Sequence, residues 1–358
     1  MRVGIVGLSS SGKTTLFRAL TRGTVRIDAG GKANVGVIPV PDPRIDYFVA
    51  QYAPKKTTYA SIEFVDGAAR IAHDGGRTKF GSDFFADVRQ VDALVHVVRA
   101  FEGPAGEAPT PVQDLQSLND ELLLADLQLI ENRLERVEKQ LHGVKKGATT
   151  PATIEMDLLK KLQAVLENGQ SLKTVEMNAE EEKSVRSYDF LTLKHMIAVL
   201  NLPEGEIGSP GEQAAKFASY CEENGVPHIE LCAEIEMEVA ELPEEEEAEF
   251  LVSMGIEEPA RNRLIRACYG ALGLISFITA GEPEVRAWTL KAGSKAVDAA
   301  GAIHSDLARG FIRAEIANFT DVEAAGGWEA AKQKQIVQLQ GKDYEIKDGD
   351  VLYIRFKV

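Results

Sequence analysis

The chain has 358 residues with 40 basic and 55 acidic side chains, a net charge of −15 and a hydrophobic content of 44%. This length predicts two or three domains, and the hydrophobic content suffices for their buried cores. The acidic balance argues against a protein that coats nucleic acid without sequence preference, although it permits a local basic patch.

The three cysteines lack metal-type spacing and indicate a reduced, cytoplasmic protein. No apolar run approaches the length of a membrane-spanning helix, and the strand expected at the N-terminus leaves no room for a signal peptide.

Residues 7–14 fit G-x-x-x-x-G-K-S/T, the pattern of the phosphate-binding P-loop. An apolar strand is predicted before the motif and the first turns of a helix after it, which is the setting the motif requires. A Gly/Ser turn that matches by chance is the alternative, and this setting argues against it. Backbone N–H groups would face the phosphates, Lys13 would reach the outer phosphates and Thr14 would hold Mg²⁺. The expected nucleotide contacts are Ser9, Ser10, Ser11, Gly12, Lys13, Thr14 and Thr15.

Residues 1–115 alternate strand-like and helix-like segments, which indicates an α/β fold with a mainly parallel sheet. Buried strands are predicted over residues 60–66 and 93–98. Ligands of such folds bind at the carboxyl ends of the strands, where both Gly7 and Asp66 fall. We therefore expect Asp66 to be the acid that faces Mg²⁺; an Asp that only caps its strand is the alternative.

A heptad pattern follows, with apolar residues at spacings of four and three. Its members are Leu123, Leu127, Ile130, Leu134, Val137 and Leu141. The helical pattern breaks at residues 143–151 and resumes over 154–167, which predicts a coiled-coil hairpin; two ordinary core helices are the alternative. Because a buried strand returns at residues 193–200, the hairpin is read as an insertion in the α/β domain.

The last part of the chain changes character at residue 277, where short strand-like pieces alternate with Gly/Asp turns. This pattern predicts a small, independent β-grasp module. The expected domains are a nucleotide-binding domain over residues 1–118 and 190–275, a helical arm over 119–189 and a C-terminal domain over 276–358.

The base-reading motif departs from the GTPase pattern N-K-x-D, whose Asp binds guanine. Residues 201–204 follow a predicted strand and read N-x-x-E, so the lysine is absent and the acid is longer. A site that lacks the guanine-reading group favours adenine or relaxed specificity. We expect Asn201, Leu202 and Glu204 at the base, with an ordinary strand-end turn as the alternative.

Taken together, these residues resemble the YchF family of Obg-related P-loop proteins, the Obg-like ATPases, over essentially the whole chain. The similar segments are residues 34–44, 95–102, 120–137, 277–281, 299–306, 310–315, 341–344 and 348–351. The resemblance implies a Ras-like P-loop NTPase domain with an inserted antiparallel coiled-coil hairpin and a C-terminal TGS β-grasp domain. It also implies ATP in preference to GTP, Mg²⁺, and association with ribosomes or RNA through the arms and the groove between them. We expect no membrane partner, and we favour a monomer, although the sequence does not determine the oligomeric state.

The chain departs from the family pattern where hydrolysis would occur. Gly30 falls at the switch I threonine position, and the D-x-x-G motif ends in Ala69, which is followed by Arg70. The histidine to which family hydrolysis is attributed is absent from residues 103–112; His73 is the nearest alternative in sequence.

Two functional interpretations follow from these departures. In the first, the protein is a slow ATPase in which Arg70 or Arg77 replaces the missing catalytic groups. In the second, it binds nucleotide without appreciable hydrolysis and recruits a partner as a scaffold. A nucleic-acid enzyme ranks last, because the sequence shows no acidic cluster or metal-ligand set for it.

Overall fold

The computed structural model describes residues 1–26, 33–66, 71–74, 77–80, 82–142, 150–209 and 211–357. The chain forms two compact units. Unit 1 comprises Met1–Gly36 and Phe64–Ala260, and unit 2 comprises Val37–Glu63 and Arg261–Val358. The sequence-based boundaries assign Val37–Glu63 to the nucleotide-binding domain, whereas the contacts of the folded chain group this segment with the C-terminal region.

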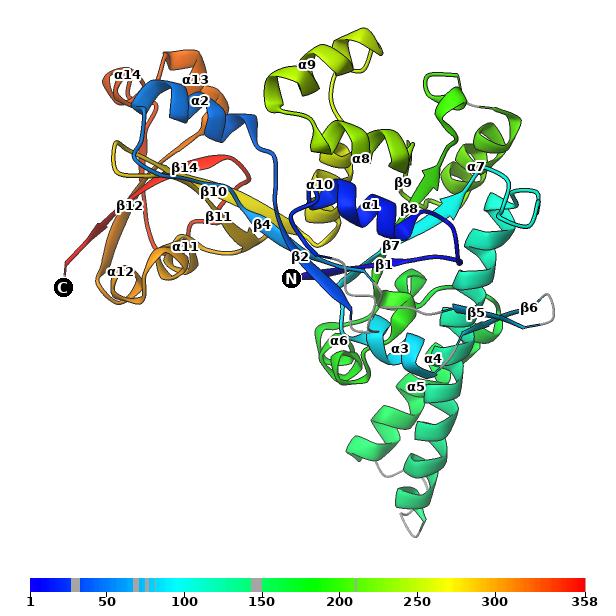
Figure 1. The fold of residues 1–358 in the computed structure, drawn as a ribbon. Helices are drawn as coiled ribbons and strands as arrows, with labels where there is room; N and C mark the ends of the chain where they lie inside the picture. Colours follow the sequence, from blue (N-terminus) through cyan, green and yellow to red (C-terminus); the bar gives the residue numbers. More distant parts are fainter. Residues whose placement is uncertain are drawn as a thin grey trace. The chain divides into compact units, whose positions relative to one another are not determined.

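The central sheet of unit 1 has the strand order β2-β4-β1-β7-β8-β9 (Figure 1). Its strands are β1 (Arg2–Val6), β2 (Asn34–Pro39), β4 (Ser61–Asp66), β7 (Ala93–Arg99), β8 (His195–Asn201) and β9 (His228–Leu231). Strands β1, β7, β8 and β9 pair in parallel, as predicted for an α/β fold. Strands β2 and β4 each continue from one unit into the other. A separate hairpin pairs β5 (Ile71–Asp74) with β6 (Arg77–Phe80).

Helices cover both faces of this sheet. Leu94 and Val98 of β7 point to one face, where α3, α4 and α7 contribute to the same buried clusters. Helices α1 and α8 pack against each other on the opposite face (Figure 1). The helices of this unit are α1 (Lys13–Leu20), α3 (Ser82–Arg89), α4 (Pro111–Leu141), α5 (Pro151–Glu167), α6 (Ala179–Val185), α7 (Glu212–Glu223), α8 (Ala233–Glu241) and α9 (Glu244–Ser253). The next helix, α10 (Ala260–Ala271), belongs to unit 2 except for its first residue. Short 3₁₀ turns are η1 (Leu172–Thr174), η2 (Arg186–Tyr188), η3 (Leu191–Leu193) and η4 (Glu204–Glu206).

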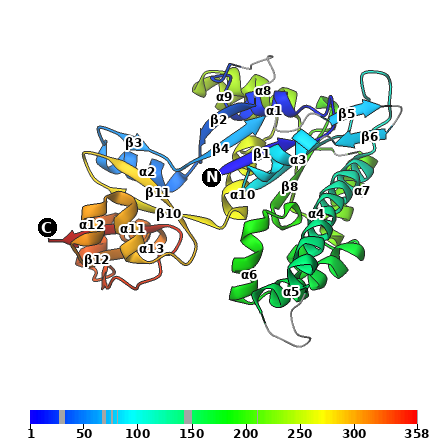
Figure 2. The ribbon, with the colours of Figure 1, turned by 90° about the horizontal axis from the view of Figure 1, so that it is seen from below.

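The predicted hairpin is confirmed: α4 and α5 pack side by side in both views (Figures 1 and 2). Ile130, Leu134 and Val137 of the heptad pattern are buried against Leu159 and Leu162 of α5. Thr150 begins α5 with a reciprocal capping box to Thr153, which satisfies backbone donors of its first turn. The apolar period of the sequence was therefore sufficient to place this element.

Unit 2 is built on a mixed sheet with the strand order β13-β12-β14-β10-β11-β3, as expected for a β-grasp module. Its strands are β3 (Thr57–Thr58), β10 (Leu274–Ala280), β11 (Val285–Lys291), β12 (Phe311–Asn318), β13 (Gln338–Gln340) and β14 (Asp350–Phe356). Helices α11 (Ala296–Ile303) and α12 (Ser305–Arg309) lie on one face, and α2 (Pro43–Tyr52), α13 (Phe319–Ala325) and α14 (Trp328–Gln333) lie on the other (Figure 1).

The N-terminal segment of unit 2 is held by polar and aromatic contacts. Asp42 accepts a hydrogen bond from the backbone N–H of Arg44 and begins α2. The Arg44 guanidinium donates to both carboxylate oxygens of Asp42 at 2.8 Å and to Asp348 at 2.7 Å. Phe48 packs edge-to-face on Phe319, with the ring centres 5.7 Å apart. These contacts explain why Val37–Glu63 belongs to the C-terminal unit.

Candidate functional site

The P-loop connects β1 to α1 and requires glycine at both ends. Gly7 and Gly12 have φ angles of 146° and 94°, a region that side chains disfavour. A Cβ on Gly7 would lie 2.2 Å from the Val97 carbonyl oxygen, and one on Gly12 would lie 2.1 Å from Nδ2 of Asn201. The loop therefore packs against the ends of β7 and β8 with no room for side chains at these two positions.

Lys13 is the first residue of α1, and its ammonium group donates to the Leu8 carbonyl at 2.6 Å, which folds it over the loop. Burial lowers the pKa of Lys13, and the nearby Asp66 carboxylate opposes that shift. Asp66 ends β4 and is 3% exposed. The strand-end acid predicted from the sequence thus lies near the P-loop lysine, as a metal-facing acid of such a site would.

Asn201 connects the P-loop to the start of α8. Its Nδ2 donates to the Ser11 carbonyl at 2.9 Å, and its Oδ1 accepts from the Ala233 N–H at 2.9 Å. The side chain is 4% exposed. Asn201 therefore fixes the P-loop relative to the start of α8, and it is this bridge that brings residues 201–204 next to the phosphate loop. Ala233, which supplies the second half of the bridge, is the middle residue of Cys232-Ala233-Glu234, the segment that stands where the family resemblance places a second base-site motif, S-A-K.

The other P-loop residues expected to contact the nucleotide differ in how far they are exposed to solvent. Ser9, Ser10 and Thr14 are exposed, and Thr15 is half-buried. Ser11 is buried, and its hydroxyl has no hydrogen-bond partner among the described residues.

At the base end, Leu202 is buried and donates its N–H to the Leu231 carbonyl. Glu204 is exposed at the start of η4. The structure thus brings the P-loop residues together with Asn201 and Leu202 at the carboxyl ends of neighbouring strands.

Several residues of the predicted switch segments fall outside what the structure describes. Gly30, Ala69 and Arg70 lie in the ranges 27–32 and 67–70, which are not among the described residues. His73 and Arg77 belong to the hairpin of β5 and β6, where only the backbone is described. The proposed catalytic substitutes therefore keep the status of sequence predictions.

The described residues fit a phosphate ligand with a hard divalent cation. The loop offers glycine positions that a Cβ would block, a half-buried lysine and the unpartnered Ser11 hydroxyl. Thr14 and Asp66 supply hydroxyl and carboxylate oxygens, the donors that Mg²⁺ prefers. Within the described ranges, His, Cys, Asp and Glu side chains form no group of three or more suited to a metal ion. The donor set therefore suits a cation held jointly with the phosphates of a nucleotide.

His96 lies beneath this site and was not singled out by the sequence. It pairs with Val6 of β1, is 1% exposed, and its Nδ1 has no partner among the described residues. Burial, with a smaller effect of the nearby Lys13 charge, lowers the pKa of His96 to about 3. The side chain is therefore neutral in the folded protein at physiological pH.

We expect His96→Leu to flatten the loss of stability in acid. Because the folded pKa of His96 lies below its unfolded value of about 6.5, the unfolded chain takes up a proton as the pH falls through that value. This uptake reduces native stability progressively from about pH 6.5 toward pH 3. Urea unfolding at pH 7 and pH 5 measures the effect. An equal loss of stability between these two pH values in wild type and variant would contradict the prediction.

The fold and the P-loop define a nucleotide-binding protein of the P-loop GTPase class. Two family models match the chain: a 50S ribosome-binding GTPase over residues 2–133, and the YchF GTPase C-terminal domain, described as a protein of unknown function, over residues 274–357. The chain is 40% identical to the ribosome-binding ATPase YchF of Bacillus subtilis, and 39% identical to that of Haemophilus influenzae. Both alignments cover 100% of this chain and at least 99% of the relative.

A solved structure extends the similarity to three dimensions. The YchF GTPase of Schizosaccharomyces pombe matches with a TM-score of 0.87 and 29% identity, covering 99% of this chain and 97% of that one. The chain belongs to the YchF family, which confirms the resemblance predicted from its motifs. In the part of the chain that the structure describes, no helix is long and apolar enough to cross a membrane.

Proposed function

We propose that this protein binds ATP with Mg²⁺ at the P-loop, hydrolyses it slowly and associates with ribosomes in the cytoplasm. The observation that supports nucleotide binding is the geometry of the P-loop. Gly7 and Gly12 leave no room for side chains, Lys13 folds over the loop, and Asn201 fixes the loop to the start of α8. The ribosome part is supported by relatives of full length that are named ribosome-binding ATPases.

The side chains of the site would divide the phosphate contacts among them. Lys13 would leave the Leu8 carbonyl and pair with the outer phosphates, and the backbone N–H groups of the loop would donate to the inner ones. Thr14 and Asp66 would hold Mg²⁺, the latter through water. When bound, Mg²⁺ neutralises charge that develops on the phosphates during transfer.

The base contacts would come from residues 201–204. Both polar atoms of the Asn201 amide group are engaged within the protein, so this side chain supports the pocket wall. Leu202 and Glu204 would then lie beside the base, without the lysine and aspartate that read guanine. The absence of these groups supports a preference for ATP over GTP.

Slow hydrolysis competes with a second interpretation, in which the protein binds nucleotide without hydrolysing it. Gly30 and Ala69 replace two groups that contact Mg²⁺ and the outer phosphate in related sites, and the loop of residues 103–112 has no histidine. These substitutions favour a scaffold that senses nucleotide without turning it over. We propose Arg70 as the compensating cation, because it follows the altered D-x-x-G motif directly.

Nucleotide binding and single-turnover cleavage separate these two functions, and both are measured with ATP and with GTP, in the presence of Mg²⁺ or of a chelator. Co-sedimentation with ribosomes tests the proposed ribosome association. Tighter binding and measurable cleavage of ATP, both dependent on Mg²⁺, support the slow ATPase. Binding without cleavage supports the scaffold, and unchanged turnover in Arg70→Ala excludes Arg70 as a catalytic group.

A further inference from the structure

A second cavity lies at the base of the helical arm, away from the P-loop. It has a volume of about 450 Å³, which is within the size range of sites for small organic ligands. Its walls come from the first half of α4, the segment that follows α5, the start of β8 and the end of α7. Helices α4 and α7 lie side by side (Figures 1 and 2). We call this space the arm-base cavity.

Strand β8 separates the arm-base cavity from the P-loop. Met196, near the start of the strand, lines the cavity, whereas Asn201 at its end holds the P-loop. The two residues are five positions apart along the strand, a distance of about 17 Å. A ligand in the arm-base cavity would therefore not compete with ATP for space.

Two lysines line the arm-base cavity. The ammonium group of Lys194 is used within the protein, since it donates to the Val91 carbonyl at 2.6 Å and to the Arg89 carbonyl at 3.1 Å. The ammonium group of Lys173 makes no hydrogen bond or ion pair with any residue that the structure describes. Lys173 is exposed, but the protein around it removes part of its hydration and lowers its pKa. It is thus a cation that has lost water without gaining a protein partner.

The other polar groups of the cavity leave its positive charge in excess. Asp120 of α4 is the acid among the lining residues, and within the described ranges it forms no ion pair with either lysine. Gln116 and Asn119 contribute side-chain amides that hydrogen-bond to none of the described residues. Two cations against one carboxylate, together with amide groups that can donate, favour a ligand that carries negative charge.

Apolar side chains supply the rest of the wall. They come from three elements and are Leu122, Leu123, Met196, Val226 and Pro227. Small-molecule sites combine such an apolar lining with a few polar groups that fix the orientation of the ligand. We propose that the arm-base cavity binds a small organic anion, a carboxylate or a phosphate ester with an apolar body, whose charged group pairs with Lys173.

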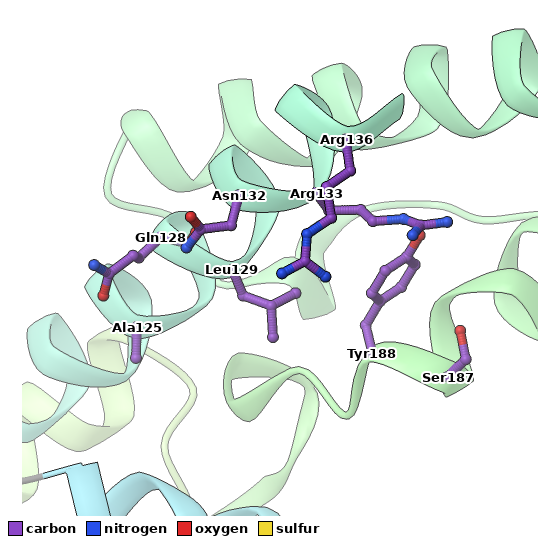
Figure 3. Close-up of a pocket in the computed structure, with 8 residues that line it drawn as sticks. All are labelled: Ala125, Gln128, Leu129, Asn132, Arg133, Arg136, Ser187 and Tyr188. Atoms are coloured by element: carbon purple, nitrogen blue, oxygen red, sulfur yellow. The ribbon is translucent and has the colours of Figure 1, made fainter. Parts of the chain in front are cut away.

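A larger hollow on α4, of about 730 Å³, is less suited to an anion (Figure 3). Arg133 in this hollow is already paired with the Glu155 carboxylate through Nε at 2.6 Å and Nη2 at 3.1 Å. The Tyr188 hydroxyl donates to the same carboxylate. Arg136 is then the charged group left to meet a ligand there, without the amides and apolar walls of the arm-base cavity.

The cavity includes residues that attach the arm. Leu191 and Thr192 line it, and their backbone N–H groups donate to the buried Asp126 carboxylate of α4. A ligand that binds only the folded protein stabilises it in proportion to its occupancy. Binding in the arm-base cavity should therefore slow amide hydrogen exchange at Leu191 and Thr192, a local effect that binding at the P-loop would not produce.

The test uses three aromatic probes and the full-length protein: 2-naphthoate, 2-naphthyl phosphate and the neutral 2-naphthamide. Their affinities are measured by NMR titration with saturating ATP and Mg²⁺, which occupy the P-loop. Both anions should bind wild type more tightly than the amide and slow exchange at Leu191 and Thr192. The tighter of the two anions identifies the charged group that the cavity prefers. Lys173→Met should weaken both anions about tenfold and leave the amide unchanged.

Lys139→Met is the matched control, because Lys139 is also exposed and lies about 28 Å further along α4 than Asp120. It should leave all three affinities unchanged, and neither substitution should alter the melting temperature. Gln116→Trp should weaken all three probes by filling the cavity. Equal anion affinities in Lys173→Met and Lys139→Met would overturn the proposal. So would displacement of the probes by ATP, or the absence of binding by all three at millimolar concentration.

Discussion

Lys13→Ala is expected to weaken ATP binding by about 10- to 100-fold, because a hydrogen bond to a charged group contributes about 1.5–3 kcal/mol. Single-turnover cleavage should fall further, by about 10²- to 10³-fold, as for other preorganised donors that stabilise developing charge. Titration with a fluorescent ATP analogue measures the first effect and rapid-quench cleavage the second. Lys216→Ala is the control, since Lys216 is a surface lysine paired with Glu212 on α7.

The ligand-free protein should respond differently to the same substitution. Lys13 is a half-buried cation whose pKa is lowered by burial, so its removal relieves a desolvation cost and leaves the Leu8 carbonyl without its donor. We expect a small change in the melting temperature without ATP, and loss of most of the increase that ATP causes in wild type. An ATP-induced increase of equal size in Lys13→Ala would show that ATP binds elsewhere.

The elements that the sequence predicted well are those specified by neighbouring residues. The P-loop needs a strand, two glycines and a helix within twenty residues, and all of these are local. The hairpin of α4 and α5 is predicted because its apolar period continues over many turns. Where a pattern is short, local signals are weaker. One of the short strand-like pieces in the C-terminal part covers residues 335–339 in the sequence, whereas β13 begins only at Gln338 because Gln335 has a left-handed φ of 60° after α14.

Features that depend on distant residues were not predictable from one sequence. Val37–Glu63 supplies β3 and α2 to the C-terminal sheet, and Arg44 reaches Asp348 across about three hundred residues of chain. The cross-strand pair of Arg313 and Arg355 depends on a register that only the folded sheet defines. Nothing in the local sequence around these residues signals their partners.

The candidate site was predicted in part. The P-loop motif located Lys13, and the predicted strand end located Asp66 nearby, because strand ends converge in a parallel sheet. Asn201 was expected to contact the base, and in the fold its amide group bridges Ser11 and Ala233. His96 escaped notice because a histidine within an apolar strand has no periodic or motif signal, and its burial depends on the helices packed over β7.

Asp126→Ala is expected to destabilise the attachment of the arm by about 3 kcal/mol, since an orphaned buried donor costs about 1–3 kcal/mol. The Asp126 carboxylate is fully buried on α4 and accepts from the Leu191 N–H at 2.9 Å and from the Thr192 N–H at 2.8 Å. It also accepts from the Thr192 hydroxyl, and Arg89 lies 3.8 Å away. Alanine would leave the backbone donors of Leu191 and Thr192 without their carboxylate partner. Amide hydrogen exchange at Leu191 and Thr192 reports this local loss directly, and chemical unfolding reports its size.

Graded variants separate the hydrogen bonds from packing. Asp126→Asn keeps one carbonyl acceptor and should cost less than alanine, and Thr192→Val removes only the hydroxyl bond and should cost least. Asp120→Ala, at an exposed position on the same helix, should change stability by no more than about 0.5 kcal/mol. ATP affinity should be unchanged in Asp126→Ala, the reverse of the pattern expected for Lys13→Ala. Unaltered exchange at both amides in Asp126→Ala would mean that other contacts attach the arm to the nucleotide-binding domain.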